Sequence, residues 1–131
     1  YRRTCPVYQE EHSDIRRVEP YVYAQTVAAR ASYDEGAARN SWLTGTAAWT
    51  FVNISQYILG VKPTPAGLRI DPCLPGALEE YSVRRRYRGA AYHIHVVQTG
   101  TYSLRVDGEN VAGNLIPMKD GKKKYHVEVT V

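Results

Sequence analysis

The residues most able to do chemistry are gathered in segment 40–49, Asn-Ser-Trp-Leu-Thr-Gly-Thr-Ala-Ala-Trp. Hydroxyl groups and a glycine stand here at the start of a strongly apolar stretch with helical periodicity. The first backbone N–H groups of a helix have no partner within it, and the helix dipole favours negative charge beside them. Glycine lets a ligand approach the backbone, and a threonine hydroxyl adds a donor. Thr44, Gly45 and Thr46 therefore predict an anion site.

The same residues also fit an ordinary helix start. Ser41 or Thr44 can accept a hydrogen bond from the first turn, which is the common role of Ser and Thr before a helix. The sequence pattern alone leaves both interpretations of Thr44 open.

Gln25 is the second candidate residue. It is a lone amide among small and aromatic side chains, in a segment for which the periodicity predicts a helix over 19–32, opened by Glu19 and Pro20. On an apolar helix face this amide needs hydrogen-bond partners, either structural groups or a ligand.

The predicted second helix runs from Ser41 or Thr44 to Leu59, with Gly60 as its C-cap. It is apolar on nearly every side. Such a helix is normally buried in a larger assembly, so we expect its partner helices to lie outside these residues.

Other polar groups have simpler explanations. Residues 84–88, Arg-Arg-Arg-Tyr-Arg, suggest a nucleic-acid patch, but alternate residues of a strand face opposite sides, so we expect solvated or interface arginines. His93 and His95 share one strand face without an evident third metal ligand, so an exposed polar face is favoured. The simplest interpretation of the lysine run at 122–124 is a solvated turn formed by Lys122, Lys123 and Lys124.

The composition is that of a folded globular protein. The chain has 131 residues, of which 44% are hydrophobic and 23% charged, with a formal net charge of +4. Cys5 and Cys73 lack zinc-ligand spacing and are expected to be free thiols in the cytoplasm. No apolar run is long enough to span a bilayer. Eleven tyrosines against one phenylalanine suit half-buried strands, although they also suit sugar faces.

The pattern changes near Lys62. The proline-rich stretch 60–75 predicts a rigid connection. Beyond it, alternation and the turns at Gly89, Thr99-Gly100, Asp107-Gly108 and Asp120-Gly121 predict about five antiparallel strands, in a sheet or part of a sandwich. No pair of a nucleophile and a base stands out, and no carboxylates are paired for catalysis.

Several motifs in order resemble the inverting disaccharide phosphorylases of glycoside hydrolase family 94, the cellobiose/chitobiose phosphorylase group. They are Glu-Pro-Tyr-Val-Tyr-Ala-Gln at 19–25, Ser-Trp-Leu-Thr-Gly-Thr-Ala at 41–47, Leu-Gly-Val-Lys-Pro at 59–63 and Gly-Leu-Arg-Ile-Asp-Pro-Cys-Leu-Pro at 67–75. The likeness continues through Arg-Tyr-Arg-Gly-Ala at 86–90, Val-Asp-Gly at 106–108 and Gly-Asn-Leu-Ile-Pro at 113–117. It covers nearly the whole chain.

The resemblance implies an α+β chain from the end of a much longer enzyme. Residues 1–62 would be the last helices of an (α/α)6 catalytic barrel, and residues 63–131 a small antiparallel β-sheet or sandwich domain. It implies cleavage of a β-linked disaccharide or oligosaccharide with inorganic phosphate as co-substrate, without another cofactor. A homodimer is the family expectation; neither nucleic acid nor a membrane is expected as a partner.

By the same resemblance, Gln25, Thr44 and Gly45 match phosphate-binding positions. The general-acid Asp and the basic and His phosphate ligands of the family would lie upstream of this chain, so none of its carboxylates is assigned to catalysis. Segment 35–39, Glu-Gly-Ala-Ala-Arg, departs from the Gly- and Arg-rich approach expected there. Alternatives are a non-catalytic carbohydrate-binding or scaffold module with a tyrosine-rich platform, and the phosphorylase-like end of a cyclic β-glucan synthase.

Overall fold

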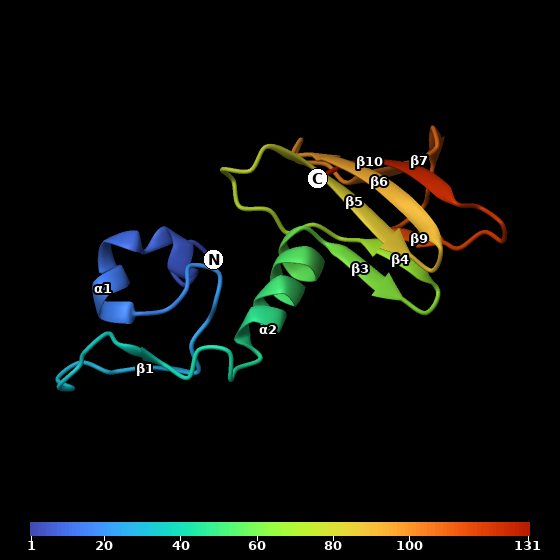
Figure 1. Cartoon of the computed structure of the whole chain (residues 1–131). Helices are drawn as coiled ribbons and strands as arrows, with labels where there is room; N and C mark the ends of the chain where they lie inside the picture. Colours follow the sequence, from blue (N-terminus) through green and yellow to red (C-terminus); the bar gives the residue numbers. More distant parts are fainter. The chain divides into compact units, whose positions relative to one another are not determined.

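The computed structural model describes residues 1–131 (Figure 1), which divide into two compact units, Tyr1–Val52 and Asn53–Val131. Short helices and mainly antiparallel sheets make this an α+β chain. None of its helices has the length and apolar character needed to cross a membrane.

The first unit contains little regular structure. It begins with two 3-10 turns, η1 (Pro6–Tyr8) and η2 (Glu10–His12), and the short helix α1 (Ser13–Arg16). A two-stranded sheet of β1 (Thr26–Val27) and β2 (Ala38–Arg39) follows, and helix α2 (Thr46–Val52) ends the unit. Its buried hydrophobic side chains are Cys5 and Val22.

The helix predicted over 19–32 is wrong. Only a turn forms at its start, where the Val22 N–H donates to the Glu19 carbonyl, and the following residues run beside segment 37–39 in an extended hairpin. Gln25 N–H donates to the Arg39 carbonyl at 3.1 Å and Ala28 N–H to the Ala37 carbonyl at 2.9 Å. A helix gains most of its stability by packing an apolar face, and the face predicted here offers mainly alanines.

The second predicted helix is confirmed, although its geometry changes along its length. Thr46–Val52 is α-helical, and Asn53–Ile58 forms a π-helix, η3. Gly60 ends it with a φ of 68°, as a C-cap glycine should. Neither part contains a buried residue, and Leu43 and Trp49 are 72% and 69% exposed.

The second unit is a sandwich of two sheets (Figure 1). The larger sheet has the order β5-β6-β10-β7-β8, and the smaller one has the order β3-β4-β9. The strands are β3 (Val61–Thr64), β4 (Gly67–Ile70), β5 (Glu80–Tyr87), β6 (Ala90–Val97), β7 (Ser103–Val106), β8 (Glu109–Asn110), β9 (Leu115–Pro117) and β10 (Lys124–Thr130).

Two sequence expectations for this unit are wrong. The stretch predicted as a rigid connection forms the hairpin β3–β4, with Pro63 on the edge strand, where a missing N–H does not interrupt the sheet. The large sheet is also not purely antiparallel: β10 enters between β6 and β7 and runs parallel to β6. The chain can make this parallel pair because β7, β8 and β9 separate the two strands in sequence.

One core joins the two sheets. Alternate residues of β6 and β10 are buried together with Leu68 and Ile70 of β4 and Ile116 of β9. Within the core the rings of Tyr92 and Tyr125 stack with their centroids 4.5 Å apart.

The sheet tyrosines face this core and tie its two sides together. The hydroxyls of Tyr81, Tyr87 and Tyr102 donate to the carbonyls of Leu59 (2.6 Å), Thr64 (2.6 Å) and Ile70 (2.9 Å), respectively. The strand role expected for most of the tyrosines is nevertheless wrong, because only four of the eleven lie in strands, Tyr81, Tyr87, Tyr92 and Tyr125. Six others are exposed and lie outside the strands: Tyr1, Tyr8, Tyr21, Tyr33, Tyr57 and Tyr102. The four strand tyrosines point inward, which leaves no tyrosine platform on the outer face of the five-stranded sheet.

Candidate functional site

The start of helix α2 is built as a capped helix start. The Gly45 carbonyl accepts the first helical hydrogen bond, from Trp49 N–H at 3.0 Å. The Thr44 hydroxyl accepts from Thr46 N–H at 3.2 Å and shares a second hydrogen bond of 2.7 Å with the Thr46 hydroxyl. The capping role predicted for Thr44 is thus present, and it satisfies one N–H group of the first turn.

Gly45 itself is not required by the local backbone. It lies outside the left-handed region, and a Cβ at this position would come no closer than 3.4 Å, to the Trp49 ring. Gly45 is exposed, and its N–H is not used by any backbone or side-chain acceptor. A ligand can therefore reach this stretch of backbone.

The residues just before the helix adopt an uncommon conformation. Asn40 and Trp42 have φ angles of 53° and 73°, and for a residue as bulky as tryptophan the left-handed region is strained. Contacts from the preceding segment hold it: the Trp42 indole N–H donates to the Glu19 carboxylate at 2.9 Å, and the Tyr21 and Trp42 rings meet edge to face. This indole hydrogen bond, followed by a backbone one, lowers the pKa of Glu19.

Gln25 lies on this helix approach rather than on a helix face. Its side chain is exposed, which contradicts the buried position expected from the sequence, and its carbonyl oxygen accepts from the Asn40 side-chain amide at 2.9 Å. The Asn40 carbonyl in turn accepts from Leu43 N–H, one residue before Thr44. Gln25 is thus joined to the loop that leads to Thr44 and Gly45, although no hydrogen bond links it to either.

A hollow of about 410 Å³ in the first unit has Thr46 and Thr50 of α2 on its wall. Arg3, Arg16 and Tyr23 also line it. The Tyr23 hydroxyl is buried without a hydrogen-bond partner. Sequence reasoning missed the two arginines because they lie 30 or more positions before Thr46 (46 − 16 = 30), and no sequence periodicity relates them to helix α2.

Matches to known proteins cover most of the chain. Residues 1–60 match the model of the glycosyl hydrolase 94 superfamily catalytic domain, and residues 62–112 match the C-terminal domain of glycosyl hydrolase family 65. The chain is 36% identical over 134 residues to an N,N'-diacetylchitobiose phosphorylase of Vibrio proteolyticus, an alignment that covers 98% of this chain and 17% of that protein.

Two further relatives agree. An N,N'-diacetylchitobiose phosphorylase of Vibrio furnissii is 40% identical over 116 residues, covering 85% of this chain and 14% of its own length. A solabiose phosphorylase of Paenibacillus borealis is 34% identical over 134 residues, covering 98% of this chain and 17% of its own length. The chain thus spans less than a fifth of the length of these curated relatives, and the resemblance stated from its motifs is confirmed. It belongs to the glycosyl hydrolase 94 superfamily, as a C-terminal portion of one of its members.

Proposed function

We propose that this chain is the C-terminal part of an inverting phosphorylase. Such an enzyme cleaves a β-linked disaccharide or oligosaccharide with inorganic phosphate and releases a sugar 1-phosphate. The observation that supports this most is the match of residues 1–60 to the family 94 catalytic domain, together with phosphorylases as relatives. The division into barrel helices at 1–62 and a β-domain at 63–131 stays a prediction of the same proposal.

In this proposal, Thr44 and Gly45 bind the attacking phosphate. Phosphate must be held in line with the anomeric carbon while its charge is balanced by positioned donors. The exposed N–H of Gly45 can donate to a phosphate oxygen, and glycine leaves space for that approach. The Thr44 hydroxyl accepts from Thr46 N–H and can still donate its own proton to phosphate.

Gln25 has a supporting place in the proposed site. Its amide nitrogen remains available because the hydrogen bond to Asn40 uses only the carbonyl oxygen. The amide can therefore donate to phosphate, while Asn40 fixes its orientation. Arg3 and Arg16, beside Thr46 and Thr50, add positive charge near the same helix turn.

The chemical step needs groups that this chain does not supply. A phosphate oxygen attacks the anomeric carbon from the face opposite the leaving sugar, whose oxygen departs with a proton from a carboxylic acid, as in inverting glycoside hydrolysis. No carboxylate lies among the residues of the proposed phosphate site. In this proposal the acid belongs to the remainder of the catalytic domain, so the chain by itself should not convert a disaccharide and phosphate to a sugar 1-phosphate.

The phosphate role is tested by Thr44→Ala in a chain that includes the entire catalytic domain. Loss of one hydrogen bond to a charged group costs about 1.5–3 kcal/mol, so kcat/KM for phosphate should fall roughly 10- to 100-fold. Thr101→Ala, which removes an exposed threonine hydroxyl in the second unit, is the matched control. An unchanged dependence on phosphate in Thr44→Ala would exclude the assigned role.

A further inference from the structure

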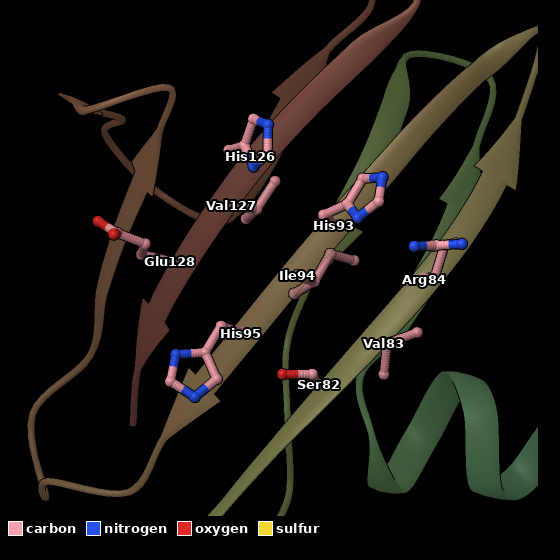
Figure 2. Close-up of a pocket in the computed structure, with 9 residues that line it drawn as sticks. All are labelled: Ser82, Val83, Arg84, His93, Ile94, His95, His126, Val127 and Glu128. Atoms are coloured by element: carbon pink, nitrogen blue, oxygen red, sulfur yellow. The ribbon is translucent and has the colours of Figure 1, made fainter.

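The outer face of the five-stranded sheet holds a polar hollow that the proposed function does not use. It has a volume of about 460 Å³ and lies over the middle of β5, β6 and β10 (Figure 2). Its polar side chains come from alternate positions of the three strands, which all point away from the core.

Three potential cations stand in one row across these strands. Arg84 of β5 is the register partner of His93 on β6, and His93 is the register partner of His126 on β10. The two imidazole rings lie side by side, with centroids 5.6 Å apart and planes inclined by 25° (Figure 2). Neighbouring strands are about 4.8 Å apart, so the whole row spans roughly 10 Å.

The next row adds positive charge. It contains Arg86 and Lys124, with Ala91 between them. Neither of these side chains, nor Arg84, makes an ion pair with a carboxylate of the chain. We call this group the cationic cluster and define it as Arg84, Arg86, His93, Lys124 and His126. Like charges on neighbouring strands destabilise a sheet, and a bound anion would reduce that repulsion.

The acidic groups of this face are engaged elsewhere. Glu80 lies 3.7 Å from His95, and Glu128, which lines the hollow, lies 3.3 Å from Arg105. Asp107 binds Lys122 and accepts the backbone N–H of His126, rather than its ring.

The neighbouring cations also affect the protonation of the His93 imidazole. Partial desolvation, and then the charges of Arg84, Lys124 and His126, lower the pKa of His93. A bound anion would compensate the charge of this cluster and reverse that effect.

We propose that the cationic cluster binds a phosphate dianion, either free inorganic phosphate or the phosphomonoester group of a sugar phosphate. The arginine fork matches two phosphate oxygens, and a neighbouring imidazole N–H can donate to a third. A phosphomonoester has its second pKa at about 6, and a neutral imidazole N–H can donate to its dianion as a protonated one does.

Two other ligands fit less well. A metal ion would need three suitable donors together, and the His, Cys, Asp and Glu residues nowhere form such a group. A nucleic-acid strand would need a longer basic track, whereas Arg85 turns to the inner face of β5 and Glu128 lines the hollow.

The test is an NMR titration of the 131-residue chain that follows the ring signals of its histidines. Inorganic phosphate and glucose 1-phosphate form the two arms, and sodium chloride at equal ionic strength is the control. We expect millimolar binding in at least one arm, with the His93 and His126 resonances shifting and the pH midpoint of His93 moving upward. His12, in the first unit, should not respond. A larger response to one ligand identifies the source of the phosphate group.

Charge-matched variants sharpen the result. Arg84→Gln should weaken binding about three- to fivefold, as expected for one solvent-exposed charge pair. Arg69→Gln removes the same charge from an exposed position on β4 of the other sheet and should leave the affinity unchanged. The dispersion of the amide spectrum shows in the same experiment that each variant is folded.

Several outcomes would overturn the proposal. Equal shifts in chloride would reduce the effect to ionic screening, and equal losses in both arginine variants would remove the site from this face. Binding of a DNA oligonucleotide without a response to either phosphate ligand would also contradict it. The cluster does not include Thr44 or Gly45, whose phosphate role is tested by the kinetics of Thr44→Ala, so failure here is distinct from failure of the proposed function.

Discussion

At the residue scale, Asp107 holds the turn between β7 and β8. Its carboxylate accepts from Lys122 at 2.5 Å and from His126 N–H at 3.0 Å, and these two hydrogen bonds lower its pKa. A carboxyl group with a depressed pKa in the folded state stabilises the protein above its unfolded pKa, near 4, and loses that contribution as the pH falls through the folded value.

Asp107→Ala should therefore lower the free energy of unfolding by about 1 kcal/mol at neutral pH, and the difference from wild type should shrink in acid. Urea unfolding at neutral pH and at pH values below about 4 measures both effects. Asp120→Ala, at another turn and without a side-chain hydrogen bond, should have little effect. A deficit for Asp107→Ala that does not depend on pH would contradict the role of the charge.

Gly67 occupies a position in β4 where no residue with a Cβ fits. Its φ is 153°, and an added Cβ would lie 2.1 Å from the backbone oxygen of Ile116 in the neighbouring strand. Gly67→Ala should cost on the order of 3 kcal/mol, because it strains the backbone and separates β4 from β9. Thermal unfolding of the 131-residue chain measures this loss. Gly76→Ala, where a Cβ would meet no atom within 4 Å, should be close to neutral in the same measurement.

At the element scale, tyrosine hydroxyls connect the five-stranded sheet and its loops to the smaller sheet and to the residue Leu59 before it. Burial raises the pKa of Tyr81 to about 12, and the same cause raises that of Tyr102. The stability contributed by a group with a raised pKa is complete below its unfolded value, near 10, and is lost as the pH rises through the folded one. The sandwich should therefore lose stability between about pH 10 and pH 12.

Tyr81→Phe tests this link directly. It leaves the Leu59 carbonyl without its hydroxyl partner and should cost about 1 kcal/mol at neutral pH, while reducing the alkaline loss. Tyrosinate absorbance and denaturant unfolding at several pH values provide the measurement. Tyr33→Phe changes a fully exposed tyrosine and should match wild type throughout. An alkaline loss of the same size in Tyr81→Phe would assign it to other groups.

The elements also show what sequence can predict here. Strict alternation identified β5, β6, β7 and β10, because one face of each strand is buried and the other is exposed. Proline hid β3, since Pro63 is acceptable only on an edge strand and edges cannot be recognised before pairing is known. The helix predicted over 19–32 rested on alanine spacing, which does not report whether another surface covers that face.

The candidate sites follow the same rule. Thr44 and Gly45 were visible because their neighbours in sequence are also their neighbours in space. The pairing of His93 with His126 was not visible, since it depends on a parallel register between residues that are 33 positions apart in the sequence (126 − 93). Local motifs thus revealed the helix-start site, and only the topology revealed the cationic cluster.

At the scale of the whole molecule, the two units differ in how much they bury. Residues 53–131 enclose a continuous core of aliphatic and tyrosine side chains, whereas residues 1–52 bury only Cys5 and Val22 among their hydrophobic residues. Large aromatic side chains of the first unit remain exposed, including Trp42 (66%) and Trp49 (69%). Because burial of apolar surface is the main favourable term in folding, the first unit should be the less stable one in this chain.

Amide hydrogen exchange of the 131-residue chain tests that difference. Amides of β6 and β10 should exchange more slowly than those of α2 by about three orders of magnitude or more, since each 1.4 kcal/mol of opening free energy contributes roughly a factor of ten. In a chain that includes the entire catalytic domain, exchange in α2 should slow markedly while β6 and β10 change little, because the added residues would cover the apolar faces of α2. Equal protection of α2 and β10 in the 131-residue chain would show instead that the first unit is stable without a larger core.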